Sequence, residues 1–313
     1  MSPSLSSAVG RAGALVVLAA GGSCSSGSGG GGEVASSVPP RATSVPSAGA
    51  ATHADVRARL AALESRYDAR LGVHAVDTGT GQIVEYRPDT RFPFASTIKA
   101  LAAGAVLDEL SRSDLRQGVR WTSADLVEYS PVTELHVEGG LPVSKVIEAA
   151  LTYSDNTAGN LLMGLVDGPD GLEERLRAVG DDTTSVDRAE PLLSTGIPGD
   201  VRDTTTPRAL ATTFASYLLG EALPVADRRL LNQSLSRSTT GTGLVRAGVP
   251  PTWQVADKSG TAGYGTRNDV AVIRPPGRAP LVIAVMSTRA TEDAEPSDAL
   301  VAAATRLAVA ELS

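Results

Sequence analysis

The sequence of 313 residues is poor in the side chains that build redox and metal centres. It contains one cysteine, Cys24, and three histidines. A single cysteine excludes an intramolecular disulfide, a cysteine-ligated zinc site and an iron–sulfur cluster. No two histidines have the spacing of a metal-binding motif such as H-x3-H. We therefore expect neither a metal ion nor a redox cofactor.

Positive charge is also scarce. The chain carries 28 Lys and Arg against 35 Asp and Glu, which gives a formal net charge of −7. Nucleic-acid binding needs clustered cations that neutralise phosphates, so the composition argues against a nucleic-acid partner. With 42% hydrophobic and 20% charged residues, the chain otherwise has the composition of an ordinary globular protein. We expect a small-molecule substrate and a monomer.

The N-terminal region lacks an apolar run long enough to cross a membrane. Arg11 precedes the short apolar run Ala12 to Gly22, which is typical of a secretory signal. Cys24 follows at once, as the acceptor cysteine of a bacterial lipoprotein does, although the leucine usual three residues earlier is missing. The alternative is a plain cleaved signal in which Cys24 has no role. We predict export, with the protein secreted, periplasmic or anchored at the cell surface through Cys24.

The rest of the chain divides by composition and periodicity. Residues 1–24 are the predicted signal, residues 25–52 a flexible Gly/Ser/Pro linker, and residues 53–313 one folded domain. Helical or alternating patterns indicate helices over 54–67, 98–110, 143–151, 206–219 and 297–312, and strands over 70–78, 82–87, 253–259, 267–273 and 280–287.

These patterns predict an α/β plus all-α architecture. Strands at both ends of the domain pair most simply into one antiparallel sheet flanked by the terminal helices. The helical middle is then an inserted lobe. We expect the sheet lobe at about 53–92 and 240–313 and the helical lobe at about 93–239, with the active site in the cleft between them.

Lysine is rare, and its positions are informative. Only Lys99, Lys145 and Lys258 occur among the 28 basic residues. In Ser96-Thr97-Ile98-Lys99 a serine and a lysine three residues apart share one face of a helix predicted to start after Pro93. A buried lysine with a lowered pKa can take the proton of such a serine, which makes a nucleophile and a base. The alternative is a helix cap with an exposed lysine. We expect Lys145 to be solvated.

Two further motifs follow in the chain. Ser154-Asp155-Asn156 lies on a loop between predicted helices, and Lys258-Ser259-Gly260-Thr261 ends a predicted strand. Taken singly, the first is explained as a helix cap and the second as a turn. Together, S-x-x-K, S-D-N and K-S-G in this order are the set recorded for class A β-lactamases and penicillin-binding proteins.

The sequence resembles the class A serine β-lactamases over the whole folded part. Residues 129–134 and 154–162 are similar to the family's segments along one side of the cleft. Residues 187–191 through 199–207 are similar to its omega loop, and Glu190 stands where the family has the glutamate that activates the deacylating water. The resemblance implies hydrolysis of the β-lactam amide bond of antibiotics through an acyl-serine intermediate, and hence β-lactam resistance.

The resemblance also implies roles for individual residues. Ser96 would be the nucleophile, and either Lys99 or Glu190 would be the base of acylation. Ser154 would pass a proton to the lactam nitrogen, and the backbone N–H groups of Ser96 and Thr261 would form the oxyanion hole. Substrate binding would fall to Asn156, Lys258, Ser259, Thr261, Arg267 and, as a wall of the entrance, Tyr129.

The omega loop carries two structural expectations and one departure. The family precedent predicts an ion pair between Arg188 and Asp203 at the neck of the loop and a cis bond between Glu190 and Pro191. Ser194 stands where the family most often has an asparagine that helps to hold the deacylating water.

Two further departures concern the cleft. Ala262 replaces a common glycine after Thr261, and Ala95 replaces the cysteine that forms an active-site disulfide in some relatives. Two other functions stay open on the sequence: a penicillin-binding D,D-peptidase, which Glu190 argues against, and a non-catalytic β-lactam sensor lipoprotein with a long-lived acyl-enzyme.

Overall fold

A computed structural model of the chain describes residues 48–313, with side chains from residue 55 onward. The predicted signal and Cys24 lie outside the described residues. In the part that is described, no helix is long and apolar enough to cross a membrane.

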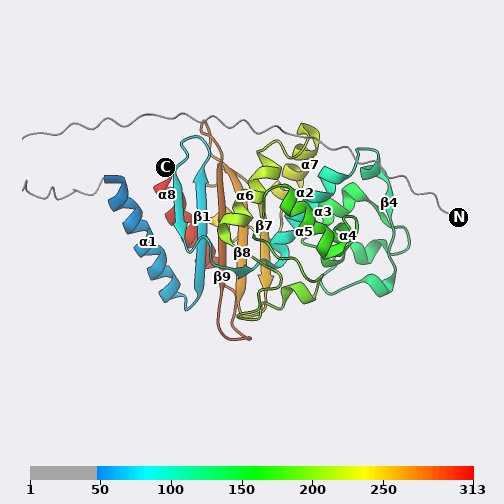
Figure 1. The fold of residues 1–313 in the computed structure, drawn as a ribbon, viewed down its shortest axis with the longest axis horizontal. Helices are drawn as coiled ribbons and strands as arrows, with labels where there is room; N and C mark the ends of the chain where they lie inside the picture. Colours follow the sequence, from blue (N-terminus) through cyan, green and yellow to red (C-terminus); the bar gives the residue numbers. More distant parts are fainter. Residues whose placement is uncertain (1–47) are drawn as a thin grey trace, which may run out of the picture. The chain divides into compact units, whose positions relative to one another are not determined.

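The centre of the molecule is a five-stranded antiparallel sheet with the order β2-β1-β9-β8-β7. The strands are β1 (Arg70–Asp77), β2 (Ile83–Tyr86), β7 (Gln254–Ala262), β8 (Thr266–Arg274) and β9 (Leu281–Thr288). Every residue of β9 is buried, because this central strand is covered on both faces. Pairing of β1 with β9 brings the two ends of the domain together (Figure 1).

Alternation along the strands creates two cores. Val255 of β7, Ile273 of β8 and Ile283 of β9 face the core formed with α1 (Ala48–Arg66) and α8 (Asp298–Glu311). Their sequence neighbours Ala256, Val272 and Val282 face the opposite way, into the core of the helical lobe. This division follows from the two-residue period of a strand. The terminal helices therefore cover one face of the sheet and the helical lobe the other.

The helical lobe surrounds α2 (Ile98–Glu109), whose residues from Ile98 to Leu107 are all buried. All of these residues except Lys99 are apolar or glycine, and a helix that is apolar nearly all round is stable only inside a core. Around it lie the other helices and two short strand pairs: α3 (Val143–Thr152), α4 (Asn156–Gly164), α5 (Gly168–Ala178), α6 (Pro207–Leu218), α7 (Val225–Ser236), β3 (Phe92–Pro93) with β6 (Thr204–Thr205), and β4 (Gly118–Val119) with β5 (Leu141–Pro142).

The predicted fold class is confirmed, and three boundaries differ. Helix α1 begins at Ala48, so the predicted linker over 25–52 was too long; its alanines favour helix as much as they suggest a linker. Strand β7 continues to Ala262, which puts Lys258 to Thr261 inside a strand, because β8 pairs with it as far as Thr266. Ser96 lies in the 3-10 turn Ala95–Thr97 that leads into α2, not in the α-helix itself.

Candidate active site

The three motifs meet in a cleft of about 510 Å³ at the β7 edge of the sheet. The turn before α2 supplies Ser96, the loop between α3 and α4 supplies Ser154, and the omega loop (residues 187–207) supplies Glu190. The cleft is lined by Ser96, Glu128, Tyr129, Ser154, Asn156, Glu190, Pro191, Ser194, Thr240, Ser259, Gly260, Thr261 and Arg267. Lys99 and Lys258 are buried behind these residues.

Lys99 forms the centre of the polar network. Its side chain is 1% exposed, and its Nζ donates to Ser96 Oγ at 2.8 Å and to the Ser154 carbonyl at 2.8 Å. The same Nζ donates to Asn156 Oδ1 at 2.5 Å. Burial lowers the pKa of Lys99, and the Glu190 carboxylate opposes that shift. Lys99 is therefore placed to exchange a proton with the Ser96 hydroxyl.

The close approach of Lys99 depends on a glycine of α4. A Cβ atom on Gly159 would lie 2.7 Å from Lys99 Cε, a distance at which one of the two must move. The α4 helix thus leaves room for the lysine stem between itself and α2, which the sequence motifs alone do not indicate.

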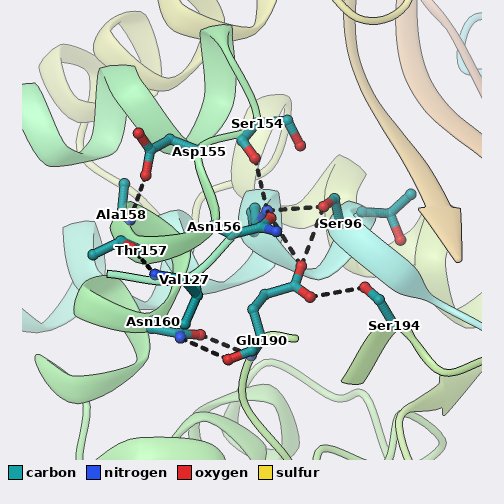
Figure 2. Close-up of polar contacts among 12 residues, drawn as sticks. Ser96, Val127, Ser154, Asp155, Asn156, Thr157, Ala158, Asn160, Glu190 and Ser194 are labelled. Carbon is teal, nitrogen blue, oxygen red and sulfur yellow. Dashed lines mark hydrogen bonds and ion pairs between the residues drawn. The ribbon is translucent and has the colours of Figure 1, made fainter. Parts of the chain in front are cut away.

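Glu190 lies between two hydroxyl groups (Figure 2). Its Oε1 accepts a hydrogen bond from Ser96 Oγ at 3.4 Å and lies 3.3 Å from Lys99 Nζ, and its Oε2 accepts from Ser194 Oγ at 2.8 Å. The Glu190 residue is 5% exposed. A buried carboxylate needs partners for its charge, and Lys99 with the two serines supplies them.

The backbone of Glu190 is held by Asn160. The Glu190 N–H donates to Asn160 Oδ1 at 2.8 Å, and Asn160 Nδ2 donates to the Glu190 carbonyl at 3.0 Å. The Glu190–Pro191 bond is cis, as expected. No sequence motif assigns Asn160 a role, although it lies four residues after Asn156 on α4 and hence on the same face of that helix.

The neck of the omega loop is closed by the expected ion pair. Arg188 pairs with Asp203, whose side chain is 1% exposed. Asp203 Oδ1 also accepts from the backbone N–H of Asp187 at 3.0 Å and of Arg188 at 2.9 Å. Asp187 Oδ2 in turn accepts from the Asp203 N–H at 3.1 Å. These reciprocal bonds tie the two ends of the loop that carries Glu190.

The S-D-N motif serves both structure and site. Asp155 caps α4 by accepting from the Ala158 N–H at 2.8 Å, and it also accepts from the N–H of Thr133 at 2.9 Å. The predicted capping explanation thus holds for the middle residue only. Ser154, with a φ of 60°, and Asn156 line the cleft on either side of Asp155.

Lys258 is the second buried lysine. Its Nζ donates to Ser154 Oγ at 2.9 Å and to the Ser259 carbonyl at 2.9 Å. Burial, helped by the positive charge of Lys99, lowers the pKa of Lys258 to about 7. Lys145 is different: its side chain is 59% exposed and pairs with Glu148, so it is solvated as expected.

The β7 side of the cleft holds the remaining predicted residues. Arg267 of β8 lies opposite Thr261 of β7, and its Nη1 donates to Thr261 Oγ1 at 2.7 Å. Asp298 at the start of α8 accepts from Arg267 Nε at 2.6 Å.

Two further residues of β7 shape this side of the cleft. Ser259 Oγ lies 2.7 Å from Oγ1 of Thr240, a residue that no sequence motif indicates. Gly260 lets the strand pass close to the Ser96 turn, since a Cβ there would lie 3.0 Å from the Phe94 carbonyl.

Asn156 and Tyr129 form the opposite side. Asn156 Nδ2 donates to the Glu128 carbonyl at 2.8 Å, which fixes its carboxamide at the cleft. Tyr129 is 57% exposed and lines the same cleft, so its ring is not packed into the core. Among the described residues, no group of three or more His, Asp or Glu side chains is arranged to hold a metal ion.

The site contains a serine hydroxyl next to a buried lysine amine, with a buried glutamate and the lysine and arginine of strands β7 and β8 around it. This arrangement defines a serine hydrolase that works through acyl transfer. The model of the β-lactamase enzyme family matches residues 55–312. The chain belongs to this family and is a class A β-lactamase, an enzyme that hydrolyses β-lactams.

Relatives and solved structures agree on the family. A β-lactamase of Amycolatopsis lactamdurans is 54% identical over 80% of this chain and 83% of its own length. The β-lactamase AST-1 of Nocardia asteroides is 52% identical over 80% of this chain and 82% of its own length. The crystal structure of a class A β-lactamase from Clostridium kluyveri is similar with a TM-score of 0.82 and 42% identity, covering 83% of this chain and 99% of the other.

Proposed function

We propose that this enzyme hydrolyses β-lactams in two steps, through an ester on Ser96 that Glu190 then helps water to cleave. The observation that carries the proposal is the position of the Glu190 carboxylate, which contacts Ser96 Oγ, Lys99 Nζ and Ser194 Oγ at once. Dividing one difficult reaction into two easier ones is the general advantage of nucleophilic catalysis.

In the acylation step, Ser96 Oγ attacks the lactam carbonyl carbon and loses its proton. Lys99 Nζ at 2.8 Å can take that proton directly, and Glu190 can take it through a water molecule. Both residues are proposed as acid–base groups. The carbonyl oxygen becomes an oxyanion, which the backbone N–H groups of Ser96 and Thr261 would stabilise.

Cleavage of the C–N bond requires a proton on the departing nitrogen. Ser154 is the proposed donor, since its hydroxyl lines the cleft and is contacted by Lys258 Nζ at 2.9 Å. Loss of that proton from Ser154 is made easier by the adjacent ammonium, which stabilises the resulting negative charge and can replace the proton.

Substrate binding is proposed to use the two sides of the cleft. Lys258, Ser259, Thr261 and Arg267 would hold the substrate carboxylate, a task suited to cations and hydroxyls in a partly desolvated groove. Asn156 would orient the side-chain amide of the substrate, and Tyr129 would form a wall of the entrance. Ala262 follows Thr261 directly, so the strand edge there differs by one methyl group from that of relatives with glycine.

In the deacylation step, Glu190 would remove a proton from a water molecule that attacks the ester carbon. Ser194 would hold this water together with Glu190, since its hydroxyl already contacts Glu190 Oε2 at 2.8 Å. A sensor would need a persistent ester, and a D,D-peptidase would retain the ester that it forms with a β-lactam. A buried carboxylate beside the nucleophile works against both. By removing β-lactams the enzyme would confer resistance.

The pH dependence of substrate capture is expected to report on Lys258. Its pKa is about 7, so the ammonium that binds the substrate carboxylate is lost as the pH rises through that value. Because kcat/KM follows the free enzyme, it should fall on the alkaline side of pH 7. In Lys258→Arg the cation cannot titrate, and the alkaline decline should disappear even where kcat/KM is lower overall. An unchanged decline in Lys258→Arg would assign it to another group. The measurement is kcat/KM of the wild type and of Lys258→Arg at pH values between 5 and 10.

Loss of the ion pair at the loop neck is expected to loosen the omega loop. Arg188→Ala leaves the buried Asp203 carboxylate without its guanidinium, which should lower the free energy of unfolding by about 3 kcal/mol. We expect kcat to fall more than the affinity for substrate, because Glu190 is carried by this loop.

The neighbouring Arg202 provides the control. It pairs with Asp200 at the surface, so Arg202→Ala should change the free energy of unfolding by less than about 1 kcal/mol. Urea unfolding of both variants measures the two free energies of unfolding. Equal decreases in Arg188→Ala and Arg202→Ala would mean that the buried pair at the neck stabilises the protein no more than a surface pair does.

Export and lipid attachment form a separate part of the proposal. Residues 1–24 would act as the signal, residues 25–47 as a tether, and Cys24 as the lipid acceptor of an enzyme that works as a monomer outside the cytoplasm. The support for export and lipid attachment is the sequence pattern around Cys24. Cys24→Ser should move activity from the membrane fraction to the medium or periplasm. Equal distribution of both proteins would refute the lipid anchor and leave export by an ordinary signal.

A further inference from the structure

A second cavity, of about 580 Å³, has part of the omega loop as one of its walls. Its walls come from residues 64–70 at the end of α1 and the start of β1, residues 196–201 of the omega loop, and residues 288–291 at the end of β9 and just after it. Arg91, Pro93 and Thr204 complete the lining. None of its lining residues lines the catalytic cleft. The volume is within the range of about 300–1,000 Å³ that is typical of small-molecule sites.

Three arginines line this cavity, and each is bound only to neutral groups among the described residues. Arg70 donates to the Arg91 carbonyl at 2.6 Å. Arg91 donates to Thr204 Oγ1 at 3.0 Å and to the Thr183 carbonyl at 2.8 Å. Arg289 donates to the carbonyls of Glu295 at 2.5 Å and Tyr67 at 3.3 Å. These bonds fix the guanidinium groups but leave their positive charges without a carboxylate partner.

The acidic side chains of the cavity compensate for these charges only in part. Glu64 is engaged by Arg87 at 3.0 Å and by the Tyr86 hydroxyl at 2.5 Å. Asp200 is engaged by Arg202 at 2.8 Å and by Arg188 at 3.6 Å. Asp68 is exposed, and within the described part of the chain it lies in no ion pair. Glu64 and Asp200 are thus paired with arginines outside the lining, and Asp68 offsets one of the three lining arginines. The cavity therefore keeps surplus positive charge, in a protein whose net charge is −7.

The rest of the wall combines hydroxyl groups with apolar side chains. Ile197 and Val201 of the omega loop are 45% and 64% exposed, and Pro198, Ala69, Pro93 and Ala290 line the cavity with them. Exposed apolar side chains beside fixed cationic donors are the combination that binds an amphipathic anion. We propose that this cavity is a second binding site, which takes an organic monoanion with its carboxylate or sulfonate on Arg70 and Arg289 and its apolar body against Ile197 and Val201.

Occupation of this site would act on the catalytic cleft through the omega loop. Residues 196–201 are separated from Ser194 by Thr195 alone, and the Ser194 carbonyl accepts from the Gly263 N–H next to β7 at 3.1 Å. One segment thus has one end at Glu190 and the other in the second cavity. A ligand that holds residues 196–201 would change the rate of deacylation. This kinetic consequence rests on the proposed role of Glu190, whereas the binding site does not.

Binding is tested by calorimetric titration of the purified enzyme with naphthalene-2-sulfonate and with the neutral naphthalene-2-sulfonamide. We expect one saturable site for the sulfonate and binding of the sulfonamide that is about tenfold weaker or more, because a charge-assisted bond to a guanidinium is lost. Arg70→Gln should weaken the sulfonate by a similar factor, and Arg70→Lys by less. Arg57→Gln, which removes an exposed charge elsewhere on α1, should leave binding unchanged.

Two further variants locate the ligand. Val201→Glu places a carboxylate on an exposed position of the wall and should also weaken the sulfonate, without a risk to folding. Arg267→Gln alters the catalytic cleft and should not affect sulfonate binding. The proposal is overturned if Arg267→Gln weakens the sulfonate while Arg70→Gln does not, or if sulfonate and sulfonamide bind equally.

The coupling is tested separately. Saturating sulfonate should change kcat severalfold in the wild type and leave kcat of Arg70→Gln unaffected. Calorimetric binding to Glu190→Ala should persist, because the second cavity does not include Glu190. Binding of the sulfonate with an unchanged kcat would overturn the coupling. If instead the proposed role of Glu190 is wrong, the calorimetric binding result still stands. The experiments therefore distinguish failure of the second site from failure of the proposed function.

Discussion

Replacement of Glu190 by alanine is expected to convert the enzyme into a protein that is acylated by penicillin and then stalls. The attacking water loses its base, and general base catalysis contributes about 10²–10⁴ to a rate. We therefore expect kcat to fall by about three orders of magnitude, with a burst of β-lactam consumption equal to the enzyme concentration. Stopped-flow absorbance with excess penicillin measures the burst and the steady rate together.

The size and speed of that burst also distinguish the two possible bases of acylation. If Lys99 takes the Ser96 proton directly, the burst should be nearly as fast as in the wild type. If Glu190 takes it through water, the burst itself should slow. Ser194→Ala is the comparison variant, because it removes the contact with Glu190 Oε2 and the proposed contact with the water but leaves the base in place, so it should reduce kcat less. Steady turnover by Glu190→Ala near the wild-type rate would contradict the proposed deacylation step.

Replacement of Ser96 by alanine is expected to abolish hydrolysis. Removal of the nucleophile of a serine hydrolase lowers kcat by about 10⁶, because no covalent intermediate can form. The change deletes one oxygen atom that is bound by Lys99 at 2.8 Å and by Glu190 at 3.4 Å, so the fold should remain intact. Hydrolysis of a chromogenic cephalosporin measures the rate, and thermal unfolding checks the fold.

The outcome that would contradict this expectation is a residual rate above about one per cent of wild type in a preparation free of wild-type enzyme. Ser154→Ala makes the comparison informative. Ser154 is proposed as a proton donor, so its loss should slow the reaction by a smaller factor, within the range of about 10²–10⁴ for general acid catalysis.

Much of the fold could be predicted from the sequence because its signals are local and strong. The alternating strands near both ends of the domain and the Ala/Leu helices between them predicted one sheet with an inserted helical lobe. The boundaries were harder. An alanine-rich stretch at Ala48 is composed like a linker and forms a helix, and β7 continues past Gly260 since β8 supplies its hydrogen-bond partners. Pairing between strands that fold together cannot be predicted from the local sequence pattern of one strand.

The candidate site could be predicted where a motif combines residue types of unusual chemistry. Ser96, Lys99, Ser154 and Lys258 were found because lysine is rare and three motifs follow in order. Asn160 and Thr240 were missed, since an asparagine on a helix and a threonine in a loop are common. Their importance depends on contacts with segments 30 and 19 residues away, which only folding brings together.

The central claim is that Ser96 carries the acyl group and that Glu190 controls its release. Intact-mass measurement after rapid acid quench, with excess benzylpenicillin, tests it in the wild type, Ser96→Ala and Glu190→Ala. We predict a stoichiometric adduct with the full mass of the penicillin in Glu190→Ala, a transient trace of the same adduct during turnover in the wild type, and none in Ser96→Ala. A stable adduct in the wild type without turnover, or an adduct on Ser96→Ala, would contradict the account.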